Sequence, residues 1–363
     1  MSAGSEQQSD HPGPIPDRLR DKIRAYPGTT TYLDLIRKNK RQSAWLIVLM
    51  ILLGAALGSA IAGAAGIYLG APAPGGPADA RAVSAFQTLA PSMVVGGMVA
   101  LIVASLAAVW SWTSGANAIL RMARAVPITK EADPELFNVV DEIRIAAGLP
   151  MPRIYMLNDS AMNAFATGRD PDHAVIAITK GLRDRLNRDE LQGVIAHEMA
   201  HVRHLDIRFA MLMATMVGII VVVCDAILRI TWYSGGIGRR SGRRGQGGSG
   251  GGAAIMLVLA LVLAILAPFL ARMIQMAYSR QREYLADAGA VELTRNPEGL
   301  ASALRRLAED TEPLVDTANR GTAHMYIVNP LRKMRKSKNS LNTVFSSHPP
   351  IEDRIARLLA LVR

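Results

Sequence analysis

Two histidines four residues apart, with a glutamate directly after the first, form the pattern in this sequence that most directly indicates chemistry. Residues 197–201 read HEMAH, which has the form HExxH. Residues four apart on a helix differ by about 40° around its axis, so His197 and His201 point to the same side, one turn apart. That spacing lets both imidazoles bind one Zn²⁺ ion, and it leaves Glu198 beside the metal, where a carboxylate can deprotonate water. The pattern therefore indicates zinc-dependent hydrolysis, with Glu198 as the general base.

A catalytic zinc ion needs a third protein ligand and one open coordination position. The extended motif HExxHxxGxxH would supply a third histidine, but residues 202–208 read VRHLDIR and do not match it. His204 lies about 10 Å from His197 along the helix axis. We therefore expect His204 to be a surface histidine and not a ligand.

A glutamate much further along the chain is the better candidate for the third ligand. Glu283 and Asp287 lie in the segment SRQREYLAD, four residues apart and therefore on one face of a helix. Glu283 could bind the metal while Asp287 accepts the second ring N–H of a ligand histidine. The alternative is an exposed acidic pair that balances Arg280 and Arg282.

The elements that must position these residues follow from periodicity and turn signals. The HExxH segment lies in a helix that opens with Asn187 and Glu190, spaced as a capping box, and continues to about residue 204. Short β-rich runs precede it at 153–157, 161–167 and 173–179. Helical periodicity predicts further helices at 134–147, 276–294, 297–310 and 351–362. The chemistry is therefore expected in an α+β, mainly helical domain.

Half of the 363 residues are hydrophobic, and much of that content is concentrated in four stretches with almost no charge. Each is about 20 residues or longer, enough to cross a hydrocarbon core of about 30 Å. They predict an integral membrane protein with four transmembrane helices, at residues 45–70, 92–112, 209–228 and 253–271. His197 and His201 precede the third stretch and Glu283 follows the fourth, so two crossings would return all three to one side.

Charge predicts the orientation of the chain in the membrane. There are 41 Lys and Arg against 30 Asp and Glu, a net charge of +11, and in a membrane protein such an excess marks cytoplasmic loops more often than a nucleic-acid partner. Basic residues at 37–41 directly before the first stretch predict a cytoplasmic N-terminus and active site. Arginines in the glycine-rich loop 234–252 oppose this orientation, so the third and fourth segments either cross fully, which we favour, or form a hairpin that does not cross.

A single cysteine excludes a disulfide framework.

Four motifs, taken in order, resemble the HtpX-like membrane zinc metallopeptidases, bacterial relatives of the CAAX prenyl proteases. Residues 163–168 read NAFATG, like the edge-strand motif of that family. Asp206 follows HExxH at the family's spacing, and residues 283–287 match ExxxD. Residues 345–350 read FSSHPP, with Arg354 after them. The resemblance covers most of residues 120–358.

The resemblance implies where a substrate would bind. Asn163, Ala164 and Phe165 would hold a peptide in extended form by β-augmentation. The alternative for Asn163 is an ordinary residue at the end of a turn or strand.

The resemblance also implies roles around the metal. His348 and Arg354 would lie near the zinc and stabilise the tetrahedral oxyanion, although without the resemblance His348 belongs to a plain loop. Asp206 would tie the end of the zinc helix to neighbouring backbone, or it is a solvated aspartate. Asp287 would accept a hydrogen bond from a ligand histidine.

Together these observations predict a zincin-type zinc endopeptidase whose cytoplasmic domain is split by a membrane hairpin. The expected organisation is a disordered, basic cytoplasmic tail (1–43), transmembrane helices 1 and 2 (44–113), the first part of the protease domain with the HExxH helix (114–207), transmembrane helices 3 and 4 (208–277), and the second part with the third ligand (278–363).

We expect one Zn²⁺ per chain, protein or peptide substrates, a lipid bilayer around the helices and no nucleic acid. By resemblance, the protein would be a multi-pass protein of the inner cell membrane that cleaves misfolded membrane proteins at the cytoplasmic face, in protein quality control. Two alternatives stay open: a prenyl-protein processing protease, which the number of membrane segments disfavours, and a catalytically silent membrane scaffold, which has no need for Glu198.

Overall fold

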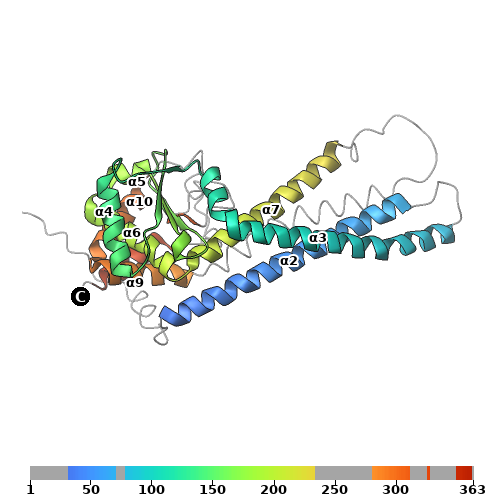
Figure 1. Cartoon of the computed structure of the whole chain (residues 1–363), viewed down its shortest axis with the longest axis horizontal. Helices are drawn as coiled ribbons and strands as arrows, with labels where there is room; N and C mark the ends of the chain where they lie inside the picture. The colour runs from blue at the N-terminus through green and yellow to red at the C-terminus, as the bar shows by residue number, and fades with distance from the viewer. Residues whose placement is uncertain (1–31, 71–77, 234–279, 311–324, 328–348, 362–363) are drawn as a thin grey trace, which may run out of the picture.

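Two long helices extend from one side of a mixed α/β region, as Figure 1 shows. α2 (Tyr32–Gly70) and α3 (Ala78–Met122) lie side by side, and α7 (Asp206–Tyr233) packs against both. The computed structural model describes residues 32–70, 78–233, 280–310, 325–327 and 349–361. α2 begins at Tyr32, so the predicted boundary of the tail at residue 43 falls inside this helix.

Small residues allow α2 and α3 to approach closely. A Cβ atom added to Gly58 would lie 2.1 Å from the Cβ of Ala100, and one added to Gly96 would lie 2.0 Å from the Cβ of Ala62. Any larger side chain at either glycine would force the helices apart. Small residues at such crossings are typical of membrane helix pairs, in which close backbone packing provides the attraction.

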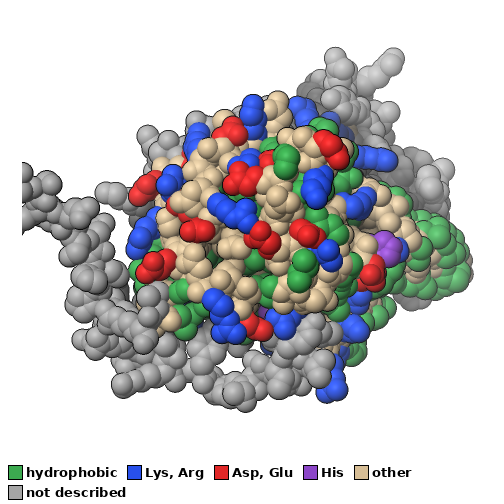
Figure 2. Space-filling view, turned by 60° about the vertical axis from the view of Figure 1, so that its left-hand side comes forward, with side chains coloured by type: hydrophobic (Ala, Val, Ile, Leu, Met, Phe, Trp, Pro, Cys, Tyr) green, Lys and Arg blue, Asp and Glu red, His purple; other side chains and the backbone are tan. Residues whose placement is uncertain are grey.

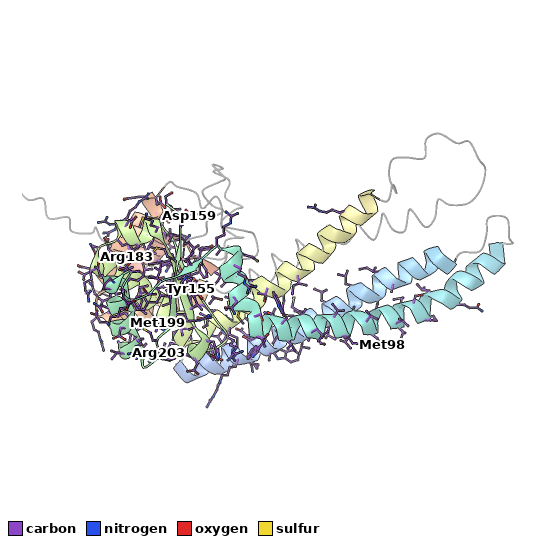
Figure 3. All side chains as sticks on the ribbon, turned by 45° about the horizontal axis from the view of Figure 1, so that its top comes forward. Met98, Tyr155, Asp159, Arg183, Met199 and Arg203 are labelled. Carbon is purple, nitrogen blue, oxygen red and sulfur yellow. The ribbon has the colours of Figure 1, made fainter. Side chains whose placement is uncertain are left out.

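Two of the predicted membrane segments have helices that are long and apolar enough to cross a bilayer. These are Arg37–Gly63 in α2 and Leu89–Met122 in α3. Large apolar side chains cover their outer surface; Leu106 is 64% exposed, and Met98 points outward, far from the α/β region (Figure 3). The third predicted stretch lies within α7, and the fourth lies outside the described residues.

The α/β region contains a four-stranded sheet in the order β1-β2-β4-β3. β2 and β4 are parallel, whereas β1 and β3 pair antiparallel to their neighbours, so β3 is an edge strand. The β-rich runs predicted from the sequence are confirmed, with later starts for β3 and β4. The strands are β1 (Val126–Pro127), β2 (Arg153–Leu157), β3 (Ala164–Thr167) and β4 (Val175–Thr179).

The HExxH helix, α6 (Arg188–Arg203), runs through the middle of this region, and nearly every side chain from Glu190 to Val202 is buried. Helices α4, α9 and α10 and strand β3 pack around it. A Cβ on Gly193 would lie only 2.7 Å from the backbone nitrogen of Leu300, so α6 and α10 depend on a glycine here. The remaining described elements are α4 (Pro134–Ala147), η1 (Pro171–His173), α5 (Lys180–Arg185), α9 (Arg280–Thr294), α10 (Pro297–Glu309) and α12 (Ile351–Leu359).

The predicted capping box at the start of α6 is confirmed. The Asn187 side chain accepts from the Glu190 N–H, and the Glu190 carboxylate accepts from the Asn187 N–H. The other carboxylate oxygen of Glu190 accepts from Ser302 Oγ at 2.6 Å and Arg306 Nε at 2.8 Å on α10. This cap therefore fixes both the start of α6 and its packing against α10.

The surface of the two parts differs in composition. Figure 2 shows basic and acidic side chains interspersed over the α/β region, whereas hydrophobic side chains dominate the helices behind it. That division fits a water-exposed domain attached to membrane helices.

Candidate metal centre

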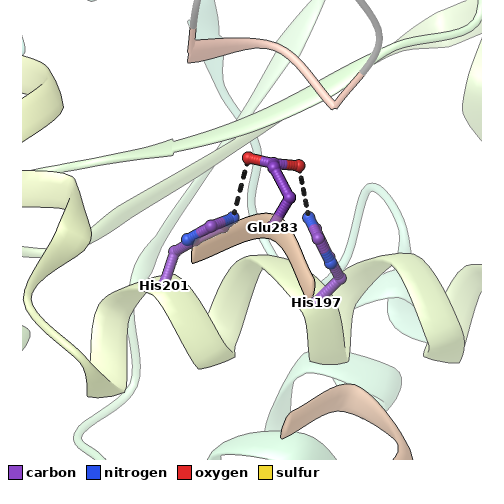
Figure 4. Close-up of side chains that lie close together, drawn as sticks. All are labelled: His197, His201 and Glu283. Carbon is purple, nitrogen blue, oxygen red and sulfur yellow. Dashed lines mark ion pairs between the residues drawn. The ribbon is translucent and has the colours of Figure 1, made fainter. Parts of the chain in front are cut away.

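Three side chains from two helices meet in the interior of the α/β region. His197 and His201 on α6 and Glu283 on α9 place their potential ligand atoms within 4.8 Å of one another, and all three residues are buried. The Nε2 atoms of the two histidines each lie 3.8 Å from an oxygen of the Glu283 carboxylate (Figure 4). Glu283 follows His201 by 82 residues in the sequence, and the three residues that meet here are those predicted as ligands.

The donor chemistry of this group suits zinc. Two imidazole nitrogens and one carboxylate form a three-ligand set that leaves a fourth, open position. Each imidazole has an aspartate at its other nitrogen: His197 Nδ1 lies 3.0 Å from Asp287, and His201 Nδ1 lies 3.1 Å from Asp206. A proton at Nδ1 leaves the Nε2 lone pair for a metal, so the residues fit the ion.

The two aspartates are held in the charged form. Burial favours the neutral acid of Asp206, but the hydrogen bond and charge of His201, together with Arg282, lower its pKa below the ordinary value. For Asp287, burial is again opposed and outweighed, here by Arg354 and His197, so its pKa is also lowered.

Arg354 on α12 is fully buried against the three ligand candidates His197, His201 and Glu283, which we call the metal group. Its Nε and Nη2 atoms donate to the two oxygens of Asp287 at 2.9 and 2.7 Å, and Nη1 lies 3.5 Å from Glu283 and donates to the Ile327 carbonyl at 3.3 Å. Arg354 therefore lies next to two of the ligand candidates, Glu283 and His197. Nη2 also lies 3.4 Å from both ring nitrogens of His197, so all the contacts of this guanidinium are with protein groups, and its role toward an oxyanion stays a prediction.

Glu198 is buried next to the metal group. Burial raises its pKa to about 7, and the nearby negative charge of Glu283 acts in the same direction, while His201, a backbone hydrogen bond from Ala166 and Arg354 oppose the rise. A carboxyl group with a pKa near neutrality can both accept and release a proton.

His204 is buried, so the prediction of a surface histidine is wrong. It caps the C-terminus of α6, where Gly289 of α9 and the turn into α7 pack close to it. It does not belong to the metal group, as predicted. Spacing along α6 could not show its burial, because α9, which covers it, comes from a distant part of the chain.

Of the predicted substrate residues, Ala164 and Phe165 lie in strand β3 and Asn163 directly precedes it. The Asn163 carbonyl accepts from Thr179 N on the β4 side. On the opposite edge, the Ala164 carbonyl accepts from Ile327 N at 2.9 Å, and Ala166 donates its backbone hydrogen bond to Glu198. The side chain of Phe165 packs edge-on against the ring of Tyr326, with 5.1 Å between the ring centres.

One residue that the sequence analysis missed reaches this site from α2. The Asn39 amide donates 2.7 Å hydrogen bonds to Asp206 and to the His204 carbonyl. The only signal in the sequence is a polar row at 39, 42 and 43 on one face of an otherwise basic segment. His348 lies outside the described residues, so its role stays a prediction.

The fold and this site together define a membrane metalloprotease of the HExxH type. A model of peptidase family M48 matches residues 130–362, and the chain belongs to that family. Its relatives include the "Protease HtpX homolog" of Dictyoglomus turgidum, 44% identical over 264 residues, or 73% of this chain and 81% of that protein. The "Protease HtpX homolog" of Streptococcus uberis is 36% identical over 323 residues, or 89% of this chain and 97% of that protein.

Among solved structures, the crystal structure of S. mikatae Ste24p aligns with a TM-score of 0.41 at 19% identity, covering 73% of this chain and 58% of that one. Family membership and the donor set agree that the protein is a zinc metalloprotease of the HtpX-like kind.

Proposed function

We propose that this protease is an endopeptidase that cleaves membrane proteins at cytoplasmic loops, in protein quality control. The observation that carries the proposal is the position of the metal group at the base of the membrane helices. α6 ends at Arg203, and α7 begins at Asp206, whose carboxylate contacts the ligand candidate His201. A centre attached in this way is well placed to reach a polypeptide close to the membrane surface.

In the proposed mechanism, His197, His201 and Glu283 would hold the zinc ion. When bound, zinc would polarise a water molecule and the carbonyl of the scissile bond. Glu198 would take a proton from the attacking water and pass it to the leaving amine, so that no covalent intermediate forms. Asp287 and Asp206 would keep the two imidazoles in the tautomer and orientation that ligation needs.

Arg354 and His348 would support this chemistry in different ways. The contacts of Arg354 favour a positioning role, in which it holds Asp287 and Glu283 against the core. His348 would supply a donor to the oxyanion, which is an expectation from the family resemblance.

The edge of β3 would bind the substrate. Ala164 and Ala166 direct main-chain groups away from β4, and Ala166 contacts the proposed base. The hydrogen bond from Ile327 to Ala164 indicates that this edge accepts another chain segment. A peptide added there in extended form would pass beside Glu198 and meet the backbone edge of Ala164 and Ala166, whereas the main-chain groups of Asn163 and Phe165 face β4.

The inner cell membrane and the cytoplasmic orientation belong to the same proposal. The basic cluster at residues 37–41 supports a cytoplasmic N-terminus. Reporter fusions at residues 80 and 180 should then read outside and inside, respectively. An outside reading at residue 180 would contradict the orientation.

The substrate proposal is tested with the purified full chain in liposomes that also contain a membrane protein with an unfolded loop. We expect the zinc-loaded enzyme to cut within that loop, and Glu198→Gln to leave it intact. Cleavage restricted to a prenylated C-terminal peptide would favour the prenyl-processing alternative. The absence of any cleavage by the zinc-loaded enzyme would favour the silent scaffold.

A further inference from the structure

Asp206 is a point at which four helices meet. Its Oδ2 atom lies 3.1 Å from Nδ1 of His201 on α6. Its Oδ1 atom accepts a 2.7 Å hydrogen bond from Asn39 Nδ2 on α2 and lies 3.4 Å from Nη1 of Arg282 on α9. Asp206 itself begins α7, and all four side chains are buried. A change at any of these partners can therefore be transmitted to the imidazole.

Asn39 makes a second hydrogen bond at the same place. Its Nδ2 atom also donates to the carbonyl oxygen of His204, the residue that caps the C-terminus of α6, at 2.7 Å. An amide nitrogen carries two hydrogens, and these two bonds use both of them. One side chain of a membrane helix thus joins the end of the HExxH helix to the carboxylate that contacts His201.

The backbone between the two acceptors has an unusual conformation. Leu205 has φ of 60°, in the left-handed region that residues other than glycine rarely adopt. This turn directs the chain from α6 into α7 so that Asp206 faces back toward His201. Because Asn39 binds an acceptor on each side of Leu205, its amide is placed to hold the turn in this form.

Neighbouring contacts fix the position of α2. Gln42, one turn after Asn39, accepts a hydrogen bond from Arg282, the residue before Glu283. The Arg282 guanidinium also lies over the ring of Phe209 on α7, 4.5 Å from its centre. Further along the same helix, Leu46 is buried in a cluster with side chains of α3 and α7. The polar end of α2 is therefore attached to both helices that carry ligand candidates.

We propose that Asn39 is a positioning residue of the metal centre, through which the first membrane helix sets the orientation of Asp206 and His201. The proposal rests on the zinc site described above. Partners of this kind around metal ligands typically change metal affinity or activity by about 10–100-fold when they are removed. Asn39 acts one contact further out, so we expect a loss at the lower end of that range, about tenfold in zinc affinity.

The test measures zinc affinity by chelator competition on the full chain purified in detergent, together with the melting temperature. Asn39→Ala should bind zinc about tenfold more weakly. Asn39→Asp keeps the volume of the side chain but replaces the donor with a carboxylate, so it should lose at least as much. Lys40→Ala, an exposed neighbour on α2, and Ser111→Ala, which removes the buried hydrogen bond to Thr215 between α3 and α7, should retain wild-type affinity.

A double-mutant cycle identifies the route of the effect. If Asn39 acts through Asp206, then Asn39→Ala should change zinc affinity little in an Asp206→Ala background. Additive losses, or an Asn39→Asp protein with wild-type zinc affinity, would overturn the proposal and leave Asn39 a packing residue. His201→Ala separates the two levels: if it binds zinc as well as the wild type does, the metal site itself is wrong. If His201→Ala loses zinc while both Asn39 variants keep it, only the positioning role fails.

Discussion

The two histidines of the metal centre are supported from opposite parts of the molecule. His197 contacts Asp287, which is held by Arg354, so its support comes from α9 and α12 in the α/β region. His201 contacts Asp206, whose other partners include a residue of the membrane helix α2. We call these the domain half and the membrane half of the site. The difference indicates that the α/β region alone can orient His197, whereas the orientation of His201 also depends on the membrane helix α2.

The largest effect on stability is expected in the domain half. Arg354→Ala would leave the buried Asp287 carboxylate without its bidentate partner, and removing one member of a buried ion pair typically costs about 3–5 kcal/mol. We expect the free energy of unfolding to fall by about that amount, measured by denaturant titration in detergent. Arg305→Ala, at an exposed position on α10, is the control. If both variants lose equally little, the pair does not hold this half together.

Zinc affinity should report on both halves separately. Asp287→Asn and Asp206→Asn each replace a charged acceptor of a ligand histidine, so each should weaken zinc binding by about 10–100-fold. Chelator competition measures both. If only one of the two variants binds zinc more weakly, then only one of the two aspartates supports zinc binding.

The domain half could be predicted well from the sequence, because its signals are local. The capping box at Asn187 marks the start of α6. Glu283 and Asp287 are four residues apart, which places both on one face of α9. Helix 134–147 was predicted with the bounds that the structure has. These features depend on residues within one or two turns of each other.

The membrane half could not be predicted in the same way. Asn39 is 167 residues from Asp206, and no periodicity links the two. The burial of His204 and the left-handed turn at Leu205 depend on the same long-range packing. In the domain half, the partners of Arg354 were missed for a similar reason, because Asp287 is 67 residues away and a motif match does not give the direction of the guanidinium.

A smaller effect, about 1 kcal/mol, is expected at the start of α6. Asn187→Ala removes the side-chain acceptor of the capping box, and substitutions of this kind typically destabilise by about that amount. The melting temperature should fall slightly while zinc affinity stays at the wild-type value. Loss of zinc from this variant would mean that any destabilisation disturbs the metal centre, which would weaken the distinction between the two halves.

The smallest effect concerns a pair that belongs to neither half. Burial opposes ionisation of Asp133, but hydrogen bonds from Arg183 and the Leu136 N–H outweigh it and lower its pKa. A lowered folded-state pKa stabilises the protein above the unfolded pKa of about 3.9, and this contribution is lost as the pH falls through the folded value. Asp133→Asn should therefore melt slightly below the wild type at pH 7, and the difference should shrink below about pH 3.9. A constant difference across this range would exclude the ion pair as its cause.

The most direct test of the central claim compares the proposed base with the proposed third ligand, by measuring zinc content and turnover on the same preparations. Glu198→Gln should keep one zinc ion per chain and lose about 10²–10⁴ in turnover, because the base lies beside the metal and not on it. Glu283→Ala should lose both zinc and activity. A zinc-replete Glu283→Ala protein, or a Glu198→Gln protein with wild-type turnover, would contradict the account.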